Sequence, residues 1–383
     1  MKVNRAYRYE LKPNVSQQIL LAKHAGCARF AYNWGLQLRI EQYEIDKKTS
    51  NAIEQHKLLN SLKASEFPWM YEVSKCAPQE ALRDLDKAYQ HFFRGIKNGK
   101  KIGFPKFKKK GLRDSFRLTG AIHVLEQGVQ LPRLGTIRTK EKTAVNGHIV
   151  SCTVRREADR WFVSVSVEME KDDPQPIGGT PVGIDLGLIT FATLSTGEKF
   201  EAPKPLAKKL KKLRRLSREH SRKVKGSANR KKSAKKLGRL HYQIRNIRTD
   251  FLHKITTTLA KTKPVIVVED LDTKAMLQNR RLSRHIADCG WAQFYLMLQY
   301  KTKWYGSKLV QTPAYFASSK ICSCCGTKID KLPLSVRNWR CECCETMHDR
   351  DVNAAKNELQ WYTESSSEIT PVEIPLVGQL TSC

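Results

Sequence analysis

The sequence predicts a multidomain protein of mixed α and β structure. Its 383 residues exceed the roughly 100 to 200 residues of a typical domain, so two or three separate cores are expected. The hydrophobic pattern changes along the chain, from mostly helical spacing to short strands and then to buried strands separated by long helices. Two Cys-x2-Cys motifs predict a small metal-binding module near the end of the chain.

The first half of the chain predicts β structure interrupted by helices. Residues 1–12 alternate polar and apolar side chains as a strand does, and helical spacing follows over Val15–Tyr43 and Gln79–Phe93. Apolar runs at Ile149–Val154 and Trp161–Val167, separated by Gly, Pro and Asn turns, predict antiparallel strands. The strands form either a small barrel into which the helices are inserted or a meander of two sheets, and the pattern does not choose between them.

The second half begins after a segment of linker composition, residues 171–181, and contains two acids on otherwise apolar strands. Asp185 interrupts an apolar run, and Glu269 ends the buried strand predicted at Val265–Val268. Charged side chains are rarely buried without a partner, and a bound cation would be such a partner. If the helical segment between the two strands is a crossover, both acids lie at the same edge of one sheet.

A third acid comes just after the second cysteine pair, where Asp349 and Asp351 both stand at the predicted start of a helix. Taken singly, each acid could merely end a strand, cap a helix or complement a helix dipole, as Asp349 could. Together, three carboxylates can hold two Mg²⁺ ions, which activate water and stabilise the leaving oxygen during phosphodiester hydrolysis. The combination therefore predicts a metal-dependent nuclease.

The cysteines predict a structural zinc ribbon in a reducing compartment, because six of the eleven lie between positions 322 and 344. Cys324 and Cys343 offer alternative sulfurs, but a glycine after the second thiolate suits the tight turn and favours Cys325 over Cys324. Four thiolates leave no open coordination position, so the Zn²⁺ supports folding and not catalysis. The expected ligands are Cys322, Cys325, Cys341 and Cys344.

The charge predicts a nucleic-acid partner, because 69 Lys and Arg against 37 Asp and Glu give a formal net charge of +32. Between Lys204 and Arg248 there are 19 basic residues and one acid, Glu219. A second basic cluster, Lys106–Lys110, is interleaved with phenylalanine. The residues expected to contact nucleic acid in these segments are Lys106, Lys108, Lys208, Lys209, Lys212, Arg214, Arg215, Arg218, Arg222, Lys231 and Lys232.

Neither a signal peptide nor a membrane-spanning helix is predicted. The first residues are polar, and no segment reaches the roughly 18 to 20 uninterrupted apolar residues of a membrane helix. We therefore expect a cytoplasmic protein without a membrane partner.

Several motifs follow one another in a specific order along nearly the whole chain. They are Leu11-Lys12-Pro13, Arg29–Asn33, Gly103–Phe107, Gly183–Gly187, Val268–Leu271, the two cysteine pairs and Asp349–Ala355. With these motifs the chain resembles TnpB, the OrfB-type nuclease family of bacterial insertion sequences, which is related to type V CRISPR effectors.

The resemblance implies four structural parts. They are an oligonucleotide-binding-like β-barrel at residues 1–12 and 115–170, an inserted helical recognition module at 13–114, an RNase H-like (RuvC) α/β nuclease domain at 180–317 and 346–363, and a zinc ribbon inserted at 318–345. Residues 364–383 are rich in Ser, Thr and Pro, show no usable pattern and are expected to be a disordered tail.

The resemblance also implies an RNA-guided DNA endonuclease of a transposon. It would bind a guide RNA, pair that RNA with double-stranded target DNA and cut beside a short adjacent motif, acting on DNA in the bacterial cytoplasm. The family's catalytic, magnesium-binding acids fall at Asp185, Glu269 and Asp351, and by position Lys75 and Gln79 correspond to contacts with the adjacent motif.

Two alternatives stay open at this point. One is a catalytically silent RNA-guided repressor, which shares every binding feature; the presence of all three acids favours an active enzyme over it. The other is a transposase that uses the same type of acidic triad to join DNA strands without RNA.

Overall fold

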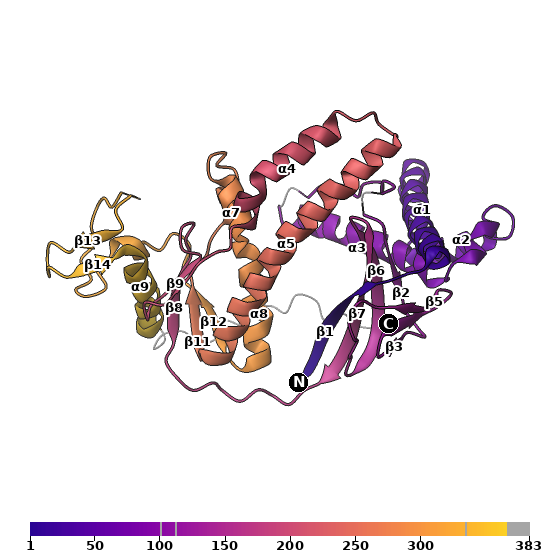
Figure 1. Cartoon of the computed structure of the whole chain (residues 1–383). Coiled ribbons are helices and arrows are strands. Elements are labelled where there is room, and N and C mark those ends of the chain that lie inside the picture. The colour runs from indigo at the N-terminus through magenta and orange to yellow at the C-terminus, as the bar shows by residue number, and fades with distance from the viewer. Residues whose placement is uncertain (100–101, 112, 334, 366–383) are drawn as a thin grey trace. The chain divides into compact units, whose positions relative to one another are not determined.

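The computed structural model describes residues 1–99, 102–111, 113–333 and 335–365. The chain divides into two compact units (Figure 1). The first contains Met1–Asp172 and Val224–Arg239, and the second contains Asp173–Lys223 and the described residues from Leu240 onward. The break after Asp172 falls within the segment of linker composition. None of the described helices combines the length and the apolar character that a membrane crossing requires.

The first unit contains two antiparallel sheets. The first sheet has the spatial order β1 (Lys2–Leu11), β7 (Arg160–Glu170), β6 (His148–Glu157) and β2 (Ser115–Leu118). The second sheet has the order β3 (His123–Leu125), β4 (Gly128–Leu131) and β5 (Gly135–Arg138). The end of β1 also meets the end of β5, because Lys12 N donates to Arg138 O at 2.7 Å and Lys140 N donates to Glu10 O at 2.9 Å. The strands predicted for this half of the chain are confirmed.

The helices of the first unit lie between β1 and β2 in sequence. They are α1 (Val15–Asp46), α2 (Ala52–Leu62), the 3-10 helix η1 (Pro68–Glu72) and α3 (Cys76–Lys97). Asn14 and Gln17 form a capping box that starts α1. Gly35 lets the three α-helices pack closely, because a Cβ there would lie 2.6 Å from Leu82 Cδ2 and 2.9 Å from Gln55 Oε1. The two predicted helices are confirmed, and both are slightly longer than expected.

The second unit is built on a mixed five-stranded sheet. Its spatial order is β10 (Lys199–Phe200), β9 (Ala192–Leu194), β8 (Val182–Asp185), β11 (Val265–Val268) and β12 (Lys308–Gln311). Strands β8, β11 and β12 are parallel, whereas β9 and β10 run antiparallel to their neighbours. The prediction that β8 and β11 are joined by a crossover in one sheet is therefore confirmed.

Five helices follow or connect these strands. They are α4 (Pro205–Ser221), α5 (Ala228–Thr262), α6 (Thr273–Met276), α7 (Ser283–Cys289) and α8 (Trp291–Tyr305). Phe191, after β8, and Phe294, on α8, are fully buried and meet edge to face with ring centroids 5.2 Å apart. Leu252 on α5 joins the same core, so sheet and helices share one hydrophobic interior.

The last part of the chain contains the cysteine-rich segment and a final helix. Its elements are η2 (Ser318–Lys320), β13 (Asn338–Arg340), β14 (Met347–Asp349) and α9 (Arg350–Ser365). Strand β14 pairs with β13, so the β-hairpin extends past residue 345, where the ribbon was predicted to end. Helix α9 also runs two residues into the predicted tail, and residues 366–383 lie outside the described residues.

Candidate functional site

The register of two parallel strands brings Asp185 and Glu269 together. Val268 on β11 pairs with Ile184 on β8, so the next residue of each strand lies at the carboxyl edge of the sheet. The Leu186 N–H donates to Glu269 Oε1 at 3.4 Å. Both side chains are partly buried. The carboxyl edge of parallel strands is where α/β proteins bind ligands.

Helix α9 packs directly against β8 and carries Asp351. A Cβ added at Gly183 would lie 2.0 Å from the Ala355 carbonyl oxygen and 2.8 Å from Leu359 N, so only glycine permits this approach. Asp351 lies one turn before Ala355. The three predicted acids thus come from β8, the end of β11 and the first turn of α9.

The acids of this site influence one another's ionisation. Burial raises the pKa of Asp185 well above its ordinary value, and the negative charges of Glu269 and Asp351 raise it further, while Arg350 and Arg337 oppose the rise. Burial raises the pKa of Glu269 to about 7, against the hydrogen bond from Leu186 N. Carboxylates that repel one another in a partly buried site are stabilised by a cation.

Asp351 is also held by a basic residue of the cysteine-rich segment. Arg337 Nη1 donates to Asp351 Oδ1 at 3.0 Å. Within the described residues, the oxygens of the three acids do not all lie within 4.8 Å of one another, whereas four cysteine sulfurs do. The donor set, three oxygen ligands that repel one another, fits a hard divalent cation such as Mg²⁺.

The polar residues around Asp351 fix the start and the orientation of α9. Asp349 Oδ1 accepts from Asp351 N at 3.0 Å and from Val352 N at 3.1 Å, which caps the helix. Asp349 also pairs with Lys199 of β10 at 2.7 Å. Asp349 thus caps the helix, and the Asp351 carboxylate is close enough to Asp185 to raise the pKa of that acid.

Two asparagines of the same motif attach α9 to the cysteine-rich segment. Asn353 Nδ2 donates to Ile321 O at 2.7 Å and its Oδ1 accepts from Ser323 N at 2.9 Å. Asn357 Nδ2 donates to Ser318 O at 2.7 Å. Both asparagines are almost fully buried. The first cysteine pair and the helix that carries Asp351 therefore form one hydrogen-bonded assembly.

The four predicted cysteines meet in a geometry that fits zinc. Cys322 and Cys344 have their sulfurs 3.6 Å apart, as do Cys325 and Cys341. Tetrahedral bonds of about 2.3 Å to zinc place sulfurs about 3.8 Å apart, whereas a disulfide needs about 2.05 Å. The alternative sulfurs of Cys324 and Cys343 are exposed and lie outside the group. His348 Nε2 lies 3.0 Å from Cys322 Sγ and connects the cluster to the start of α9.

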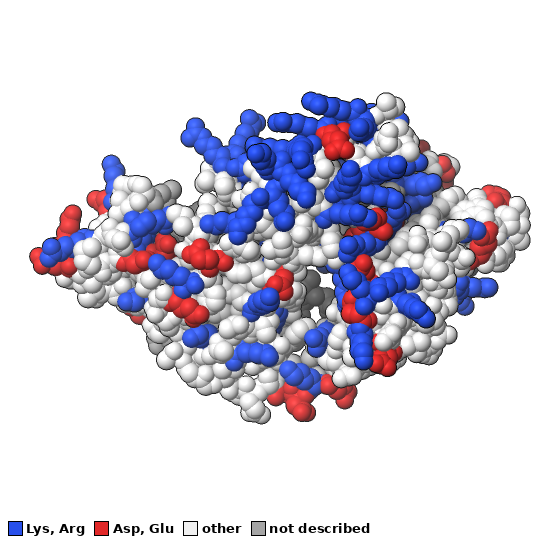
Figure 2. Space-filling view, viewed as in Figure 1, with Lys and Arg blue, Asp and Glu red and all other residues white. Residues whose placement is uncertain are grey.

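The basic residues predicted to bind nucleic acid lie largely at the surface. Figure 2 shows Lys and Arg crowded over α4. Most of these residues lie on α4, just after it or at the start of α5. Lys209 is half-buried, and the exposed ones are Lys208, Lys212, Arg214, Arg215, Arg218, Arg222, Lys231 and Lys232. Self-repulsion on one helix is expected to favour a polyanionic partner.

The remaining predicted contacts lie in the part of the chain between β1 and β2. Lys75 is exposed at the start of α3 and Gln79 is half-buried one turn later. Lys106 and Lys108 are both exposed, and the Lys108 ammonium lies 3.8 Å above the Tyr32 ring. The Lys108 backbone exchanges two hydrogen bonds with the Asn33 side chain, at 2.8 and 3.0 Å. Lys108 is thus engaged within the protein.

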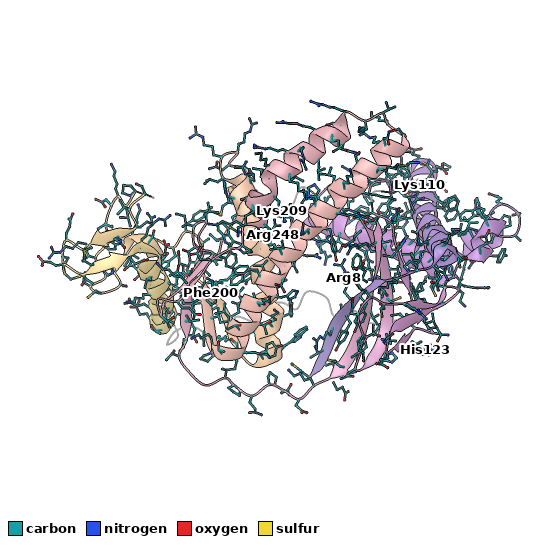
Figure 3. All side chains as sticks on the ribbon, viewed as in Figure 1. Arg8, Lys110, His123, Phe200, Lys209 and Arg248 are labelled. Atoms are coloured by element: carbon teal, nitrogen blue, oxygen red, sulfur yellow. The ribbon has the colours of Figure 1, made fainter. Side chains whose placement is uncertain are left out.

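A buried acid that the sequence did not single out starts the basic helix. Asp288 of α7 accepts from Leu206 N at 3.0 Å and from Ala207 N at 3.0 Å, so it caps α4. Arg248 of α5 forms an ion pair with Asp288 at 3.0 Å. Figure 3 labels Arg248 on α5 and Lys209 on α4. The cap and its partner come from distant segments, and no local motif indicates them.

Two further residues were missed by sequence reasoning. Arg337 precedes β13 and binds Asp351, but an arginine in a basic chain carries no signal. Glu358 on α9 is completely buried. Its signal is the seven-residue spacing from Asp351, which places both acids on one face of a helix.

Comparison with known proteins identifies the family. The model of the OrfB IS605 family, described as "Probable transposase", matches residues 164–280, and its helix-turn-helix domain matches residues 1–48. A Streptomyces pristinaespiralis protein named "Putative RNA-guided DNA endonuclease" is 38% identical over 366 residues, covering 94% of this chain and 89% of that protein. This chain belongs to the TnpB family.

Other TnpB relatives and structures extend the match. The Escherichia coli K12 protein named "Putative RNA-guided DNA endonuclease InsQ" is 34% identical over 377 residues, covering 94% of this chain and 92% of that protein. The model of the Cas12f1-like TNB domain matches residues 291–357. The solved Cas12f1 chain of a complex with sgRNA and target DNA has a TM-score of 0.55 at 13% identity, covering 93% of this chain and 98% of that chain. The TnpB resemblance seen in the motifs is confirmed, and the fold is Cas12f-like.

Proposed function

We propose that this protein is an RNA-guided DNA endonuclease of an insertion sequence, which cuts double-stranded DNA beside a short adjacent motif. The single observation that carries the proposal is the position of Asp185 and Glu269 at neighbouring parallel strand ends, with Asp351 on the helix against them. Two relatives, from Streptomyces and Escherichia, are named "Putative RNA-guided DNA endonuclease" and match 94% of the chain.

Asp185, Glu269 and Asp351 are the proposed catalytic residues and Mg²⁺ ligands. Bound Mg²⁺ would supply Lewis-acid activation of water and stabilisation of the leaving oxygen. Asp185 and Glu269 offer oxygen donors from adjacent strands, and Leu186 N–H orients Glu269. Arg337 also binds Asp351, so it would compete with a bound cation for this carboxylate.

The proposed domain structure follows from this assignment. The five-stranded sheet with α9 forms the RuvC-like nuclease domain, at residues 180–317 and 346–363, and residues 318–345 form the zinc ribbon. The two sheets of the first unit form the oligonucleotide-binding-like barrel at 1–12 and 115–170, supported by the hydrogen bonds between the ends of β1 and β5. The helical module at 13–114 would read the adjacent motif, with Lys75 and Gln79 as its contacts.

We propose that the exposed basic residues on α4 and at the start of α5 bind the backbone of the guide RNA or of its hybrid with the target. Backbone contacts neutralise phosphates and leave sequence selection to the guide. The protein would then work in the bacterial cytoplasm, on nucleoid DNA.

Co-purification followed by cleavage tests the proposal. The protein is expressed with its native transposon ends, bound RNA is sequenced, and DNA matching the RNA end is incubated with Mg²⁺. We expect cleavage that disappears in Asp185→Asn and persists in Glu198→Gln, a control that removes an exposed acid of the same unit.

The same experiment separates the alternatives. Guide-matched binding without cleavage would show a repressor. Joined DNA strands without any RNA would show a strand-transferring transposase; the family model carries the description "Probable transposase".

A further inference from the structure

Glu358 of α9 is a fully buried acid. Its exposed fraction is 0%. Neither Oε1 nor Oε2 has a hydrogen-bond partner among the described residues. An ionised carboxylate in this condition is strongly unfavourable unless a cation or donors reach it. A buried acid of this kind needs an explanation from its surroundings.

Glu358 lies on the same face of α9 as Asp351. The two residues are seven positions apart, which on an α-helix means about 10 Å along the axis and an angular offset of only about 20°. Helical side chains lean toward the N-terminus of their helix, so the Glu358 carboxyl leans toward Asp351. Helix α9 packs on β8, which carries Asp185, and on β11, which Glu269 follows directly.

The face of α9 that packs on β8 also carries small residues. Ala354 and Ala355 are buried, and Ala355 meets Gly183 of β8. An apolar residue would fill the next inward position at no electrostatic cost. The glutamate therefore has a reason other than packing.

The acids of the site act on Glu358 electrostatically. Burial raises the pKa of Glu358 well above its ordinary value, and the charges of Glu269 and Asp185 raise it further. The charges of Glu269 and Asp185 are therefore close enough to act on the Glu358 carboxyl. A cation bound between these acids would lower the pKa of Glu358 instead of raising it.

We propose that Glu358 is a fourth carboxylate of the metal centre, an oxygen donor to the divalent cation from the side of the sheet that α9 covers. The inference rests on the proposed function, because it requires the cation that Asp185, Glu269 and Asp351 would hold. Four carboxylates carry more negative charge than three and bind a hard cation more tightly.

Binding of Mn²⁺, measured by electron paramagnetic resonance on the full chain without nucleic acid, tests this inference. The variants are Glu358→Gln, which keeps the shape, and Glu358→Leu, which suits an apolar interior. Asp185→Asn removes a proposed ligand, and Glu198→Gln is the exposed control. We expect both Glu358 variants to weaken Mn²⁺ affinity by about tenfold or more, as loss of a supporting ligand does, and Glu198→Gln to leave the affinity unchanged.

Thermal unfolding in Mg²⁺-free buffer checks that the variants fold. At neutral pH the melting temperature of Glu358→Leu should equal or exceed that of the wild type, because a buried acid is removed. If the leucine variant does not fold, the isosteric glutamine variant still decides the question.

The outcomes separate the inference from the proposed function. Wild-type Mn²⁺ affinity in both Glu358 variants, together with weak binding by Asp185→Asn, would overturn the role of Glu358 and leave the proposed function standing. Equal Mn²⁺ affinity in the wild type and in Asp185→Asn would contradict the proposed metal centre, and the role of Glu358 would be wrong as well.

Discussion

At the scale of the residue, acids could be predicted only where the neighbouring sequence made them unusual. Asp185 and Glu269 interrupt or end apolar strands, so their sequence context indicated burial and their pairing followed from the topology of the sheet. Glu358 stands among helical residues, where a glutamate is ordinary. Its burial results from the packing of α9 on β8, which depends on Gly183, 175 positions earlier in the chain.

Glu269 should make the stability of the Mg²⁺-free protein depend on pH. Its pKa is raised from 4.5 to about 7. The folded state therefore holds a proton that the unfolded state loses between these values. The stabilisation from this group is present below about pH 4.5 and is lost as the pH rises through 7. The free energy of unfolding should fall over this range by on the order of 3 kcal/mol.

Chemical denaturation at intervals between pH 4.5 and 8 measures this dependence. Mg²⁺ is removed by dialysis, because a chelator would also take zinc. Glu269→Gln, which stays neutral, should show a clearly flatter profile than the wild type, whereas Glu198→Gln should not. Parallel profiles for the wild type and Glu269→Gln would contradict the raised pKa.

At the scale of the element, strands, helices and the cysteine cluster were predictable from periodicity and spacing. The polar contacts that connect these elements were not. Asp288 caps α4 across 82 positions of sequence, and its binding to Leu206 N exists only after α7 has packed. Asn353 belongs to a recognisable motif, yet its role in holding the first cysteine pair appears only in the structure. Local patterns encode elements, whereas polar contacts between elements depend on the tertiary fold.

The attachment of α9 to the cysteine-rich segment predicts that zinc supports the nuclease site. Cys341→Ser should lower bound zinc from about one ion per chain to near zero and lower stability by several kcal/mol, because a structural zinc contributes directly to folding. Elemental analysis and thermal unfolding measure the two effects. Cys343→Ser is the matched control, since Cys343 is exposed and lies outside the cluster. Equal zinc content in the two variants would refute the ligand assignment.

At the scale of the whole molecule, the net charge of +32 attracts nucleic acid to the protein over a long range. Composition alone predicted a polyanionic partner, but it could not tell a general attraction from a local binding surface. The structure places exposed cations along α4, and the dependence of binding on salt distinguishes the two.

Neutralising three residues of α4 should weaken binding more than neutralising three elsewhere. The test triple is Lys208→Gln, Lys212→Gln and Arg215→Gln, and the control triple is Lys48→Gln, Lys57→Gln and Lys142→Gln, all exposed. Both triples lower the net charge equally. Each lost phosphate contact reduces the slope of log K against log salt by about 0.7 to 0.9, so the α4 triple should reduce it by about 2 to 3.

Fluorescence anisotropy with labelled RNA over a series of salt concentrations gives these slopes. A reduced slope for the α4 triple, together with a wild-type slope for the control triple, would mean that α4 contacts phosphates directly. Equal, small changes in both triples would mean that attraction comes from the charge of the whole molecule, and the proposed role of α4 would be wrong. The comparison holds net charge constant, so the difference reports only where the cations lie.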